Sequence, residues 1–378
     1  MTSTARRLLL NPAFDEAVEP FETRRQMGYY ANPYRKRLSE YEKVLLYAQP
    51  NPDWIPGGLG LGGWTGKFAG GRGAWENYFT EARCSDWFAF RDPGSRWEQP
   101  YVKEKAEEWR EAQRFMDSSA NEHLHDDIDP EWAESVINRY LGAFINHEYG
   151  LFMAHASVVR DTFTDVLRVA AGTGGLDHLD TAQMIQAQRM FLSQVRDDVV
   201  EDIAPAKETW LTDPALAGAR AAVEKLWGES YDPVETLFGM YMVYEPLFGR
   251  FARRELFHNH AGLHGDHFTS RTMWSALRAG DAAARWNFDL FERVLAGDPT
   301  YAAYNVKVMR MWAETWVPVA LSAMADLVPL WSSTGRLRAA SPGPETAARK
   351  VAKEWLADYA PVFGWEASVD DLVGEVIR

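Results

Sequence analysis

Asp-Pro pairs, each followed by a long stretch of helical periodicity, constrain the fold of this 378-residue chain more than any other feature. The pairs are Asp129-Pro130, Asp213-Pro214, Asp232-Pro233 and Asp298-Pro299. Asp accepts hydrogen bonds from the unpaired N–H groups of a first helical turn, and Pro already holds a helical φ and has no N–H to leave unpaired. Each pair therefore predicts the start of a helix.

The predicted helices are long and leave little of the chain for other structure. After Asp129 apolar residues recur every three or four positions until the glycines at 172–175, which predicts a helix of about 40 residues and about 60 Å. Further helices are predicted over about 181–207, after Asp232, over about 268–297 with a break near Ala279-Gly280, and after Asp298. Because no stretch alternates like a strand, the chain is predicted to be all-α, with a ferritin-like bundle of long helices over residues 96–378.

Residues 1–95 differ from the rest and are predicted to form an extended N-terminal arm. Pro and Gly are frequent there, and the segment 50–75 has no helical periodicity. Aromatic residues such as Trp54, Trp64 and Trp75 would anchor the arm, so we expect it to wrap the bundle or a partner subunit. The alternative is an arm that packs only on its own bundle. The glycine-rich run lacks the patterns that bind nucleotide phosphates.

Charge and composition exclude several classes of partner. The formal net charge of −14 argues against nucleic acid and anionic membranes, which need clustered Lys and Arg. Cys84 is the single cysteine, which excludes an intramolecular disulfide and fits a reducing cytoplasm. The N-terminus lacks the apolar region of a signal peptide, and the apolar stretch 316–331 is too short to span a bilayer. We therefore expect a cytoplasmic protein.

Two Glu-x-x-His motifs are the first candidates for a metal site. They are Glu122 to His125 and Glu255 to His258. A ferritin-like di-iron centre uses a Glu from each of two helices and a Glu-x-x-His from each of two others. The first motif lies in a polar, acidic stretch before a helix start, and the second lies near the end of a helix. Both positions favour a solvated helix end over an iron ligand.

Other catalytic patterns give no further candidate for a site. His258, His260, His264 and His267 form a cluster in the sequence that could bind a metal or could simply belong to a polar helix end and loop. The single cysteine has no assignable partner, and neither G-x-S-x-G nor H-E-x-x-H occurs.

The segment HEYGLFMAHASVVRDTFTDVL, residues 147–167, resembles the beta subunit of soluble methane, propane, phenol and toluene monooxygenase hydroxylases. Residues 35–54, 85–109, 242–256 and 283–295 carry supporting resemblance. The resemblance implies an α2β2 hydroxylase core, with a di-iron centre in the partner alpha subunit, a coupling protein, and a reductase that uses NADH with flavin and iron–sulfur groups. The overall resemblance is nearest to the propane type. Phenol, alkene and cyclic-ether substrates, a third subunit and the surface for the coupling protein stay open.

The pattern of the iron-bearing alpha subunits, laid on this chain, implies that its own iron ligands are lost. The single Glu positions fall on Glu148 or Tyr149 and on Glu245, while Gln194 and Asp197 take the place of one Glu-x-x-His. Ala282 and Arg285 take the place of the other. We therefore predict no catalytic, cofactor-binding or metal residue in this chain. We also predict that Arg285 pairs with Glu245 or Asp197 where a metal would lie.

The resemblance predicts a non-catalytic structural beta subunit of an NADH- and O2-dependent di-iron monooxygenase that hydroxylates small hydrocarbons, propane or another short alkane first among them. The alternative is a self-sufficient ferritin-like di-metal oxidase that uses Glu122, His125, Glu255, His258 and Glu148.

Overall fold

The structure is a computed structural model that describes residues 39–47, 80–85, 87–162, 164–332 and 342–377. Helices dominate these ranges and no strand occurs in them, which confirms the predicted all-α class. Most of the predicted arm, including Trp54, Trp64 and Trp75, lies outside the described residues. Its wrapping role and the division at residue 95 therefore stay predictions.

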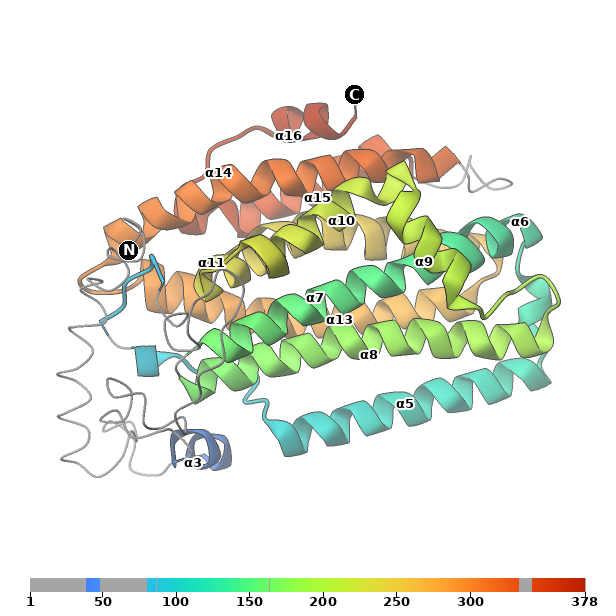
Figure 1. The fold of residues 1–378 in the computed structure, drawn as a ribbon, viewed down its shortest axis with the longest axis horizontal. Helices are drawn as coiled ribbons and strands as arrows, with labels where there is room; N and C mark the ends of the chain where they lie inside the picture. Colours follow the sequence, from blue (N-terminus) through green and yellow to red (C-terminus); the bar gives the residue numbers. More distant parts are fainter. Residues whose placement is uncertain (1–38, 48–79, 86, 163, 333–341, 378) are drawn as a thin grey trace.

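Four long helices form the centre of the bundle. They are α7 (Gly142–Asp161), α8 (Asp165–Val195), η9 (Phe238–His258) and α13 (His267–Phe288). In Figure 1, α7, α8 and α13 run side by side along the long axis of the molecule. Contacts join α7 to α8, α8 to α13, and α13 to η9. This layered arrangement of long helices is the predicted ferritin-like bundle.

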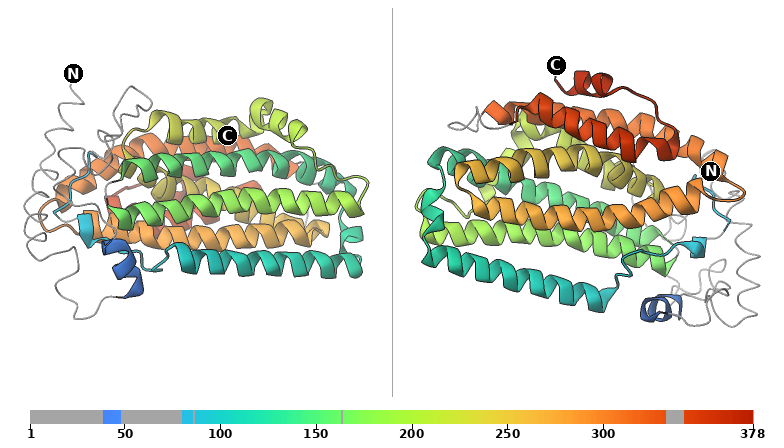
Figure 2. Two further views of the ribbon diagram at one scale, coloured as in Figure 1. Left: turned by 60° about the horizontal axis from the view of Figure 1, so that its bottom comes forward. Right: turned by 180° about the vertical axis from the view of Figure 1, so that it is seen from behind.

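Outer helices cover the central four on two sides. Helix α5 (Glu98–Asn121) lies along α8, and α14 (Ala302–Leu327) packs against η9 and α10 (Ala217–Glu224). Figure 2, seen from behind, shows α15 (Pro344–Asp358, red) packed along the same side as α14, with α16 (Val369–Val376) beyond it. The shorter elements are α3 (Glu40–Tyr47), η4 (Trp87–Ala89), η5 (Leu124–Asp127), α6 (Pro130–Trp132), η6 (Ala133–Leu141), α9 (Ile203–Thr212), η7 (Pro214–Leu216), η8 (Lys225–Glu229), α11 (Pro233–Leu237), α12 (Asn259–Ala261), η10 (Gly262–His264), η11 (Asp289–Ala296), η12 (Val328–Ser332) and η14 (Ala360–Phe363).

The Asp-Pro pairs begin helices as predicted. The carboxylates of Asp129, Asp213 and Asp232 each accept a hydrogen bond from the backbone N–H two residues later, and the following Pro is the first helical residue. Asp298 instead accepts from the N–H groups of Thr300 and Tyr301 and closes a turn just before α14. Three helix starts are thus confirmed, and the fourth pair caps the turn that leads into its helix.

Two predicted boundaries along α7 and α8 are wrong. The helix that starts at Pro130 ends at Asp161, and the glycines at 172–175 lie inside α8 instead of ending a helix. A Cβ on Gly175 would lie 2.7 Å from the Cβ of His155, so this glycine allows α7 and α8 to approach closely. Helix α8 then ends at Val195 and not near residue 207, and α9 follows as a separate helix.

The predicted break near Ala279-Gly280 is also wrong, since α13 continues through both residues to Phe288. Pro246 lies inside η9, which is π-helical over all of its 21 residues. Proline cannot donate the backbone hydrogen bond of a regular helix, and π-helical turns are frequent at functional sites. Nearly all side chains of η9 are buried.

Residues 80–85, one of the described parts of the predicted arm, are hydrogen-bonded to polar residues at or near the starts of helices in the bundle. Thr80 Oγ1 donates to Asp232 Oδ2 at 2.9 Å, and Ser85 N donates to Asp298 Oδ2 at 2.7 Å. Between them, Arg83 N donates to Asn305 Oδ1 at 2.9 Å. This short segment therefore packs on its own chain.

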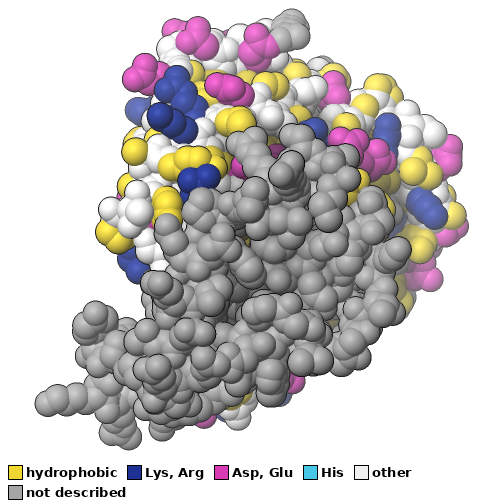
Figure 3. Space-filling view, turned by 60° about the vertical axis from the view of Figure 1, so that its left-hand side comes forward, with side chains coloured by type: hydrophobic (Ala, Val, Ile, Leu, Met, Phe, Trp, Pro, Cys, Tyr) yellow, Lys and Arg dark blue, Asp and Glu magenta, His cyan; other side chains and the backbone are white. Residues whose placement is uncertain are grey.

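The described surface carries mixed charges. Figure 3 shows one end of the molecule, where the described acidic, basic and apolar side chains are interspersed and not sorted into separate fields. Among the described residues, no helix is both long and apolar enough to cross a membrane.

Candidate functional site

A buried ionic cluster joins α7, α8 and η9 at the heart of the bundle. Arg253 Nε donates to Glu148 Oε1 at 2.8 Å, and the other nitrogens of the same guanidinium donate to both carboxylate oxygens of Glu245. On the other side of Glu148, His178 Nδ1 lies 2.7 Å from Oε2. Glu148 is fully buried and Arg253 is 4% exposed, so the cluster is shielded from bulk water.

Electrostatics hold Arg253 and Glu148 in their charged forms. Burial by itself would raise the pKa of Glu148, but the nearby charge of Arg253 and the hydrogen bonds from His147 and His178 together outweigh it and hold that pKa well below its usual range. Burial would likewise lower the pKa of Arg253, but the carboxylates of Glu148 and Glu245 outweigh it and raise that pKa. A permanent guanidinium therefore neutralises the carboxylates at the centre of the bundle.

A pair of neutral groups, one from α7 and one from η9, extends the cluster. His155 Nδ1 lies 2.8 Å from the carbonyl oxygen of Leu151, so it carries the proton, and Nε2 accepts a hydrogen bond from the Tyr241 hydroxyl at 2.7 Å. Burial first, and then the proximity of His178, lowers the pKa of His155 to about 3. Burial raises the pKa of Tyr241 well above its usual range. Both side chains thus stay neutral at physiological pH.

The face that α13 turns to this cluster consists of small residues. Ala276, Ala279, Gly280 and Ala283 line the same void as Glu148, His178, Glu245 and Arg253. The void measures about 10 Å³, which is room for one water molecule at most. Alanine and glycine side chains have no ligand atoms, so α13 contributes nothing that could coordinate a metal.

The residues present do not fit a di-iron centre. Such a centre needs four carboxylates and two histidines, whereas this cluster has the two carboxylates of Glu148 and Glu245, with His147 and His178 beside Glu148. Asp177 also borders the void, but its oxygens lie 2.9 Å from Arg96 Nη1 and 3.0 Å from Lys105 Nζ. The Arg253 guanidinium, which has no acceptor and keeps its proton, lies between the two glutamates. The cluster can hold helices together, but it cannot bind two irons.

Several positions predicted from the sequence lie elsewhere. Glu148 is fully buried and the Glu245 side chain is 10% exposed, while Tyr149 is 51% exposed. Gln194 and Asp197 are exposed at and beyond the end of α8, so their predicted placement in the core is wrong. Arg285 is exposed too, and the predicted ion pair is made by Arg253 instead. Ala282 is half-buried, one position from the Ala283 that lines the void.

Sequence reasoning missed His178 and Arg253. A helix end was predicted at residues 172–175 and the next helix from about residue 181, so His178 was not assigned to a helix, although it lies in the central part of α8. Arg253 stands next to Arg254, and the pair suggested a surface, although only Arg254 is half-exposed. One signal was available for Arg253. It follows Glu245 by eight positions on a helix whose side chains are nearly all buried.

The first Glu-x-x-His motif lies at a helix end, as predicted. Glu122 is the exposed residue that follows α5, and its carboxylate accepts a hydrogen bond from Ser118. The second motif differs from prediction, because Glu255 is only 2% exposed. Its carboxylate is bound by Arg254 and by Lys350 Nζ at 2.9 Å, and His258 Nδ1 lies 2.9 Å from the carbonyl oxygen of Ser270. Salt bridges from Arg254 and from Lys350, whose side chain is 50% exposed, therefore hold the buried carboxylate of Glu255.

The histidines of the 258–267 segment contact different partners. His260 Nδ1 lies 2.9 Å from the carbonyl oxygen of Glu255, His264 stacks on Trp132, and His267 is exposed. Their side chains are used for separate local contacts, and they do not form one of the candidate metal clusters of the described residues.

Comparisons with known proteins agree with this description. A family model described as Methane/Phenol/Alkene Hydroxylase matches residues 64–298. The chain is 40% identical over 361 residues to the methane monooxygenase component A beta chain of Methylococcus capsulatus, covering 95% of this chain and 92% of that one. It is 29% identical over 317 residues to the small hydroxylase subunit of propane 2-monooxygenase from Rhodococcus jostii, covering 84% of each. The fold is similar to a chain of phenol hydroxylase from Pseudomonas sp. OX1, with a TM-score of 0.70 at 15% identity over 89% of this chain and 98% of that one.

Proposed function

The chain belongs to the methane/phenol/alkene hydroxylase family, as a beta (small) subunit of the hydroxylase component, and from this premise we propose that it carries no iron and acts as a structural support for an iron-bearing alpha subunit. The guanidinium of Arg253 between Glu148 and Glu245 is the observation that carries the proposal. A cation built into the chain supplies the charge that a metal would otherwise supply, so the helices pack without one.

The proposed substrate of the whole enzyme is a short alkane. Two methane monooxygenase beta chains share 40% and 41% identity with this chain, and the propane 2-monooxygenase small subunits share 26–29%. Relatives from both enzymes support hydrocarbon oxidation. The sequence analysis favoured propane as the substrate. Because identity is higher to the methane enzymes, we extend the proposed substrates to methane and the other short alkanes.

The proposed assembly is an α2β2 core that works in the cytoplasm. A coupling protein and a reductase with NADH, flavin and iron–sulfur groups would act on the alpha subunit, where the chemistry takes place. The net charge of −14 supports protein partners over nucleic acid. Exposed aromatic residues such as Trp227, Tyr231 and Trp274 offer the rigid, low-entropy contacts that protein interfaces favour.

Iron analysis of the purified chain tests the proposal against the alternative of a self-sufficient di-metal oxidase. We expect no stoichiometric iron in this chain alone and a di-iron centre only after co-purification with the alpha subunit. About two irons in each isolated chain, with an oxo-bridged absorption band, would support the alternative. The positions named for that alternative argue against it, because Glu122 is exposed and Glu255 is already bound by Arg254 and Lys350.

A further inference from the structure

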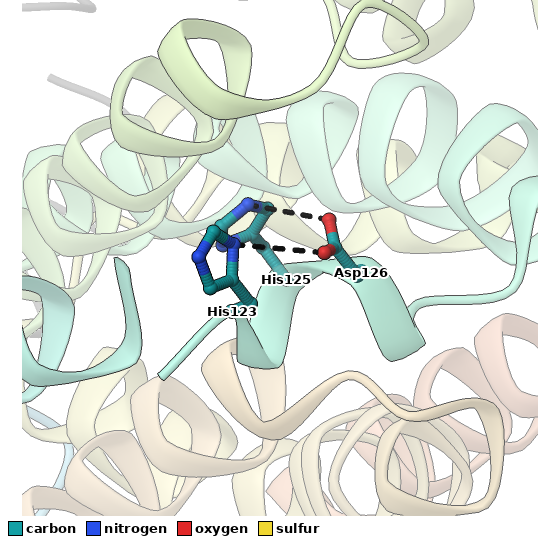
Figure 4. A group of neighbouring side chains, drawn as sticks. All are labelled: His123, His125 and Asp126. Carbon is teal, nitrogen blue, oxygen red and sulfur yellow. Dashed lines mark ion pairs between the residues drawn. The ribbon is translucent and has the colours of Figure 1, made fainter. Parts of the chain in front are cut away.

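Two histidines and an aspartate converge in the turn that follows α5, well away in sequence from the ionic cluster. His123, His125 and Asp126 each offer one ligand atom, and these atoms lie within 4.8 Å of one another. Figure 4 shows both imidazole rings facing the same carboxylate. The Glu-x-x-His motif in the sequence paired His125 with Glu122, whereas in the structure His125 lies beside Asp126 and His123.

The spacing of these atoms matches a metal site. His125 Nε2 lies 3.3 Å from one oxygen of Asp126, and His123 Nδ1 lies 3.7 Å from the other. Zn²⁺ binds nitrogen and oxygen ligands at about 2.0–2.1 Å in a tetrahedron, which places neighbouring ligand atoms roughly 3.3 Å apart. The His123 side chain is 74% exposed, so packing does not prevent its ring from rotating toward the other two ligand atoms.

The backbone fixes this arrangement before any ion binds. His123 has φ 58°, in the left-handed region, and its carbonyl oxygen accepts a hydrogen bond from Asp126 N at 3.0 Å. Arg196 Nη1 donates to the carbonyl oxygen of His125 at 2.6 Å and ties the turn to the residue after α8. Few non-glycine residues hold a left-handed φ without a reason. Here this conformation turns His123 toward His125 and Asp126.

His125 is the most buried member of the group. Its side chain is 8% exposed, so packing restricts the movement of its ring. Its Nε2, the proposed ligand atom, is aimed at Asp126.

We propose that His123, His125 and Asp126 bind a divalent transition ion of the zinc class, with solvent completing the coordination sphere. Two imidazoles and one carboxylate suit Zn²⁺, Co²⁺, Ni²⁺ or Cu²⁺, whereas Mg²⁺ and Ca²⁺ require oxygen ligands. The acidic neighbours Glu122 and Asp127 add to the negative potential that attracts a cation. The site stands independently of the role proposed for the whole chain.

His123→Gly is the sharpest variant for the test. It removes one ligand, and glycine accepts the left-handed φ more easily than histidine, so the variant should fold at least as well as the wild type. His267→Ala is the matched control, because it removes an exposed histidine from another segment. Asp126→Asn is a second ligand variant at an exposed position.

Full-length chain, stripped with a chelator, would be titrated with Zn²⁺ by calorimetry and with Co²⁺ by visible absorption. We expect one high-affinity site and tetrahedral Co²⁺ bands in the wild type and in His267→Ala, with a loss of affinity of at least about tenfold in His123→Gly and Asp126→Asn. Diethyl pyrocarbonate labelling, read by mass spectrometry, should show Zn²⁺ protecting His123 but not His267. This readout also works in the complex with an iron-bearing subunit.

Three results would overturn the site. The first is the same Zn²⁺ affinity in His123→Gly as in the wild type, which would place the ion elsewhere. The second is the absence of Zn²⁺ binding by the wild-type chain, which would leave His123, His125 and Asp126 as an ordinary surface ion-pair group. The third is equal labelling of His123 with and without Zn²⁺.

Discussion

Arg253 Nε lies 2.8 Å from Glu148 Oε1, and both residues are almost completely buried. The contact joins η9 to α7 across the centre of the bundle. The same guanidinium also binds Glu245, so one cation is shared between two carboxylates, of which Glu148 is fully buried and Glu245 has a side chain that is 10% exposed. Removal of that cation would leave the buried carboxylate of Glu148 without its arginine, together with the mostly buried carboxylate of Glu245. The first two predictions follow from this contact.

Arg253→Ala should strongly destabilise the chain. Breaking a buried ion pair by removing one partner costs about 3–5 kcal/mol, because the remaining charge stays buried and unpaired. Chemical denaturation followed by circular dichroism would measure the loss. The triple variant Arg253→Met, Glu148→Gln, Glu245→Gln should recover most of it, since no charge is left buried. Arg349→Ala, which breaks exposed pairs with Glu345 and Asp370, should cause no measurable change. An Arg253→Ala variant as stable as Arg349→Ala would contradict the assigned role of the cluster.

Arg253→Ala should also gain a divalent metal. The vacated space would be lined by Glu148, Glu245 and His178, whose two carboxylates and one imidazole are ligands for Mn²⁺, Fe²⁺ or Zn²⁺. We expect added Zn²⁺ to raise the unfolding midpoint of Arg253→Ala and to leave that of the Arg253 parent unchanged. Both chains should carry His123→Gly, so that the site after α5 does not contribute. If the unfolding midpoint of Arg253→Ala is the same with and without Zn²⁺, Glu148, Glu245 and His178 do not lie close enough together to bind it.

The sequence predicted the helical bundle because local signals are strong along this chain. The carboxylates of Asp129, Asp213 and Asp232 cap helices at the positions where the Asp-Pro pairs predicted starts. The role predicted for Gly175 was wrong. A glycine can end a helix or allow two helices to pack closely, and the sequence alone does not distinguish these two roles. Only its distance to His155 on α7 distinguishes the two roles.

The expected ligand positions on α8 were also wrong. The motif of the alpha subunits was laid on Gln194 and Asp197 at the far end of the helix, while the residue that faces Glu148 is His178. An arginine does pair with Glu245, but it is Arg253 and not the predicted Arg285. The choice between them depended on which side of its helix each residue occupies. Contacts between helices decide that orientation, and the spacing within one helix does not.

The carboxyl group of Glu235 should make stability depend on pH. Burial first, and then the charge of Asp232, raises the pKa of Glu235 to about 7. The folded chain therefore holds this proton more tightly than the unfolded chain, whose Glu titrates near pH 4.5. Stability should fall as pH rises from about 4.5 to about 7 and stay level above that, with a total loss of up to about 3 kcal/mol from this group.

Glu235→Gln isolates this effect, because the amide oxygen can still accept the hydrogen bond from Trp316 Nε1. We expect the variant to match the wild type at pH 4.5 and to be more stable than the wild type at pH 8. Urea unfolding at both pH values measures the difference. Glu134→Gln, at an exposed position, should show no such divergence. Parallel pH profiles for Glu235→Gln and the wild type would contradict the raised pKa.

Asn305 is expected to decide whether residues 80–85 stay on the bundle. Its amide is fully buried, accepts from Arg83 N at 2.9 Å, and donates to the carbonyl oxygens of Arg83 at 2.7 Å and Leu295 at 2.9 Å. Asn305→Ala leaves these three groups without their partner. Since an unsatisfied buried polar group costs about 1–3 kcal/mol and Arg83 can regain water once released, we expect a loss of about 3 kcal/mol in total.

Hydrogen exchange separates a local release of this segment from a general loss of stability. The amides of residues 83–85 should exchange much faster in Asn305→Ala, while those of α7 and η9 keep their protection. Ser85→Ala is the matched control, because it removes only the hydroxyl contact with Asp298 and keeps the backbone hydrogen bond to the same carboxylate. It should cost about 1 kcal/mol and leave the exchange of Arg83 nearly unchanged. Equal exchange in the two variants would mean that Asn305 does not hold the segment, and that the carboxylates of Asp232 and Asp298 are sufficient.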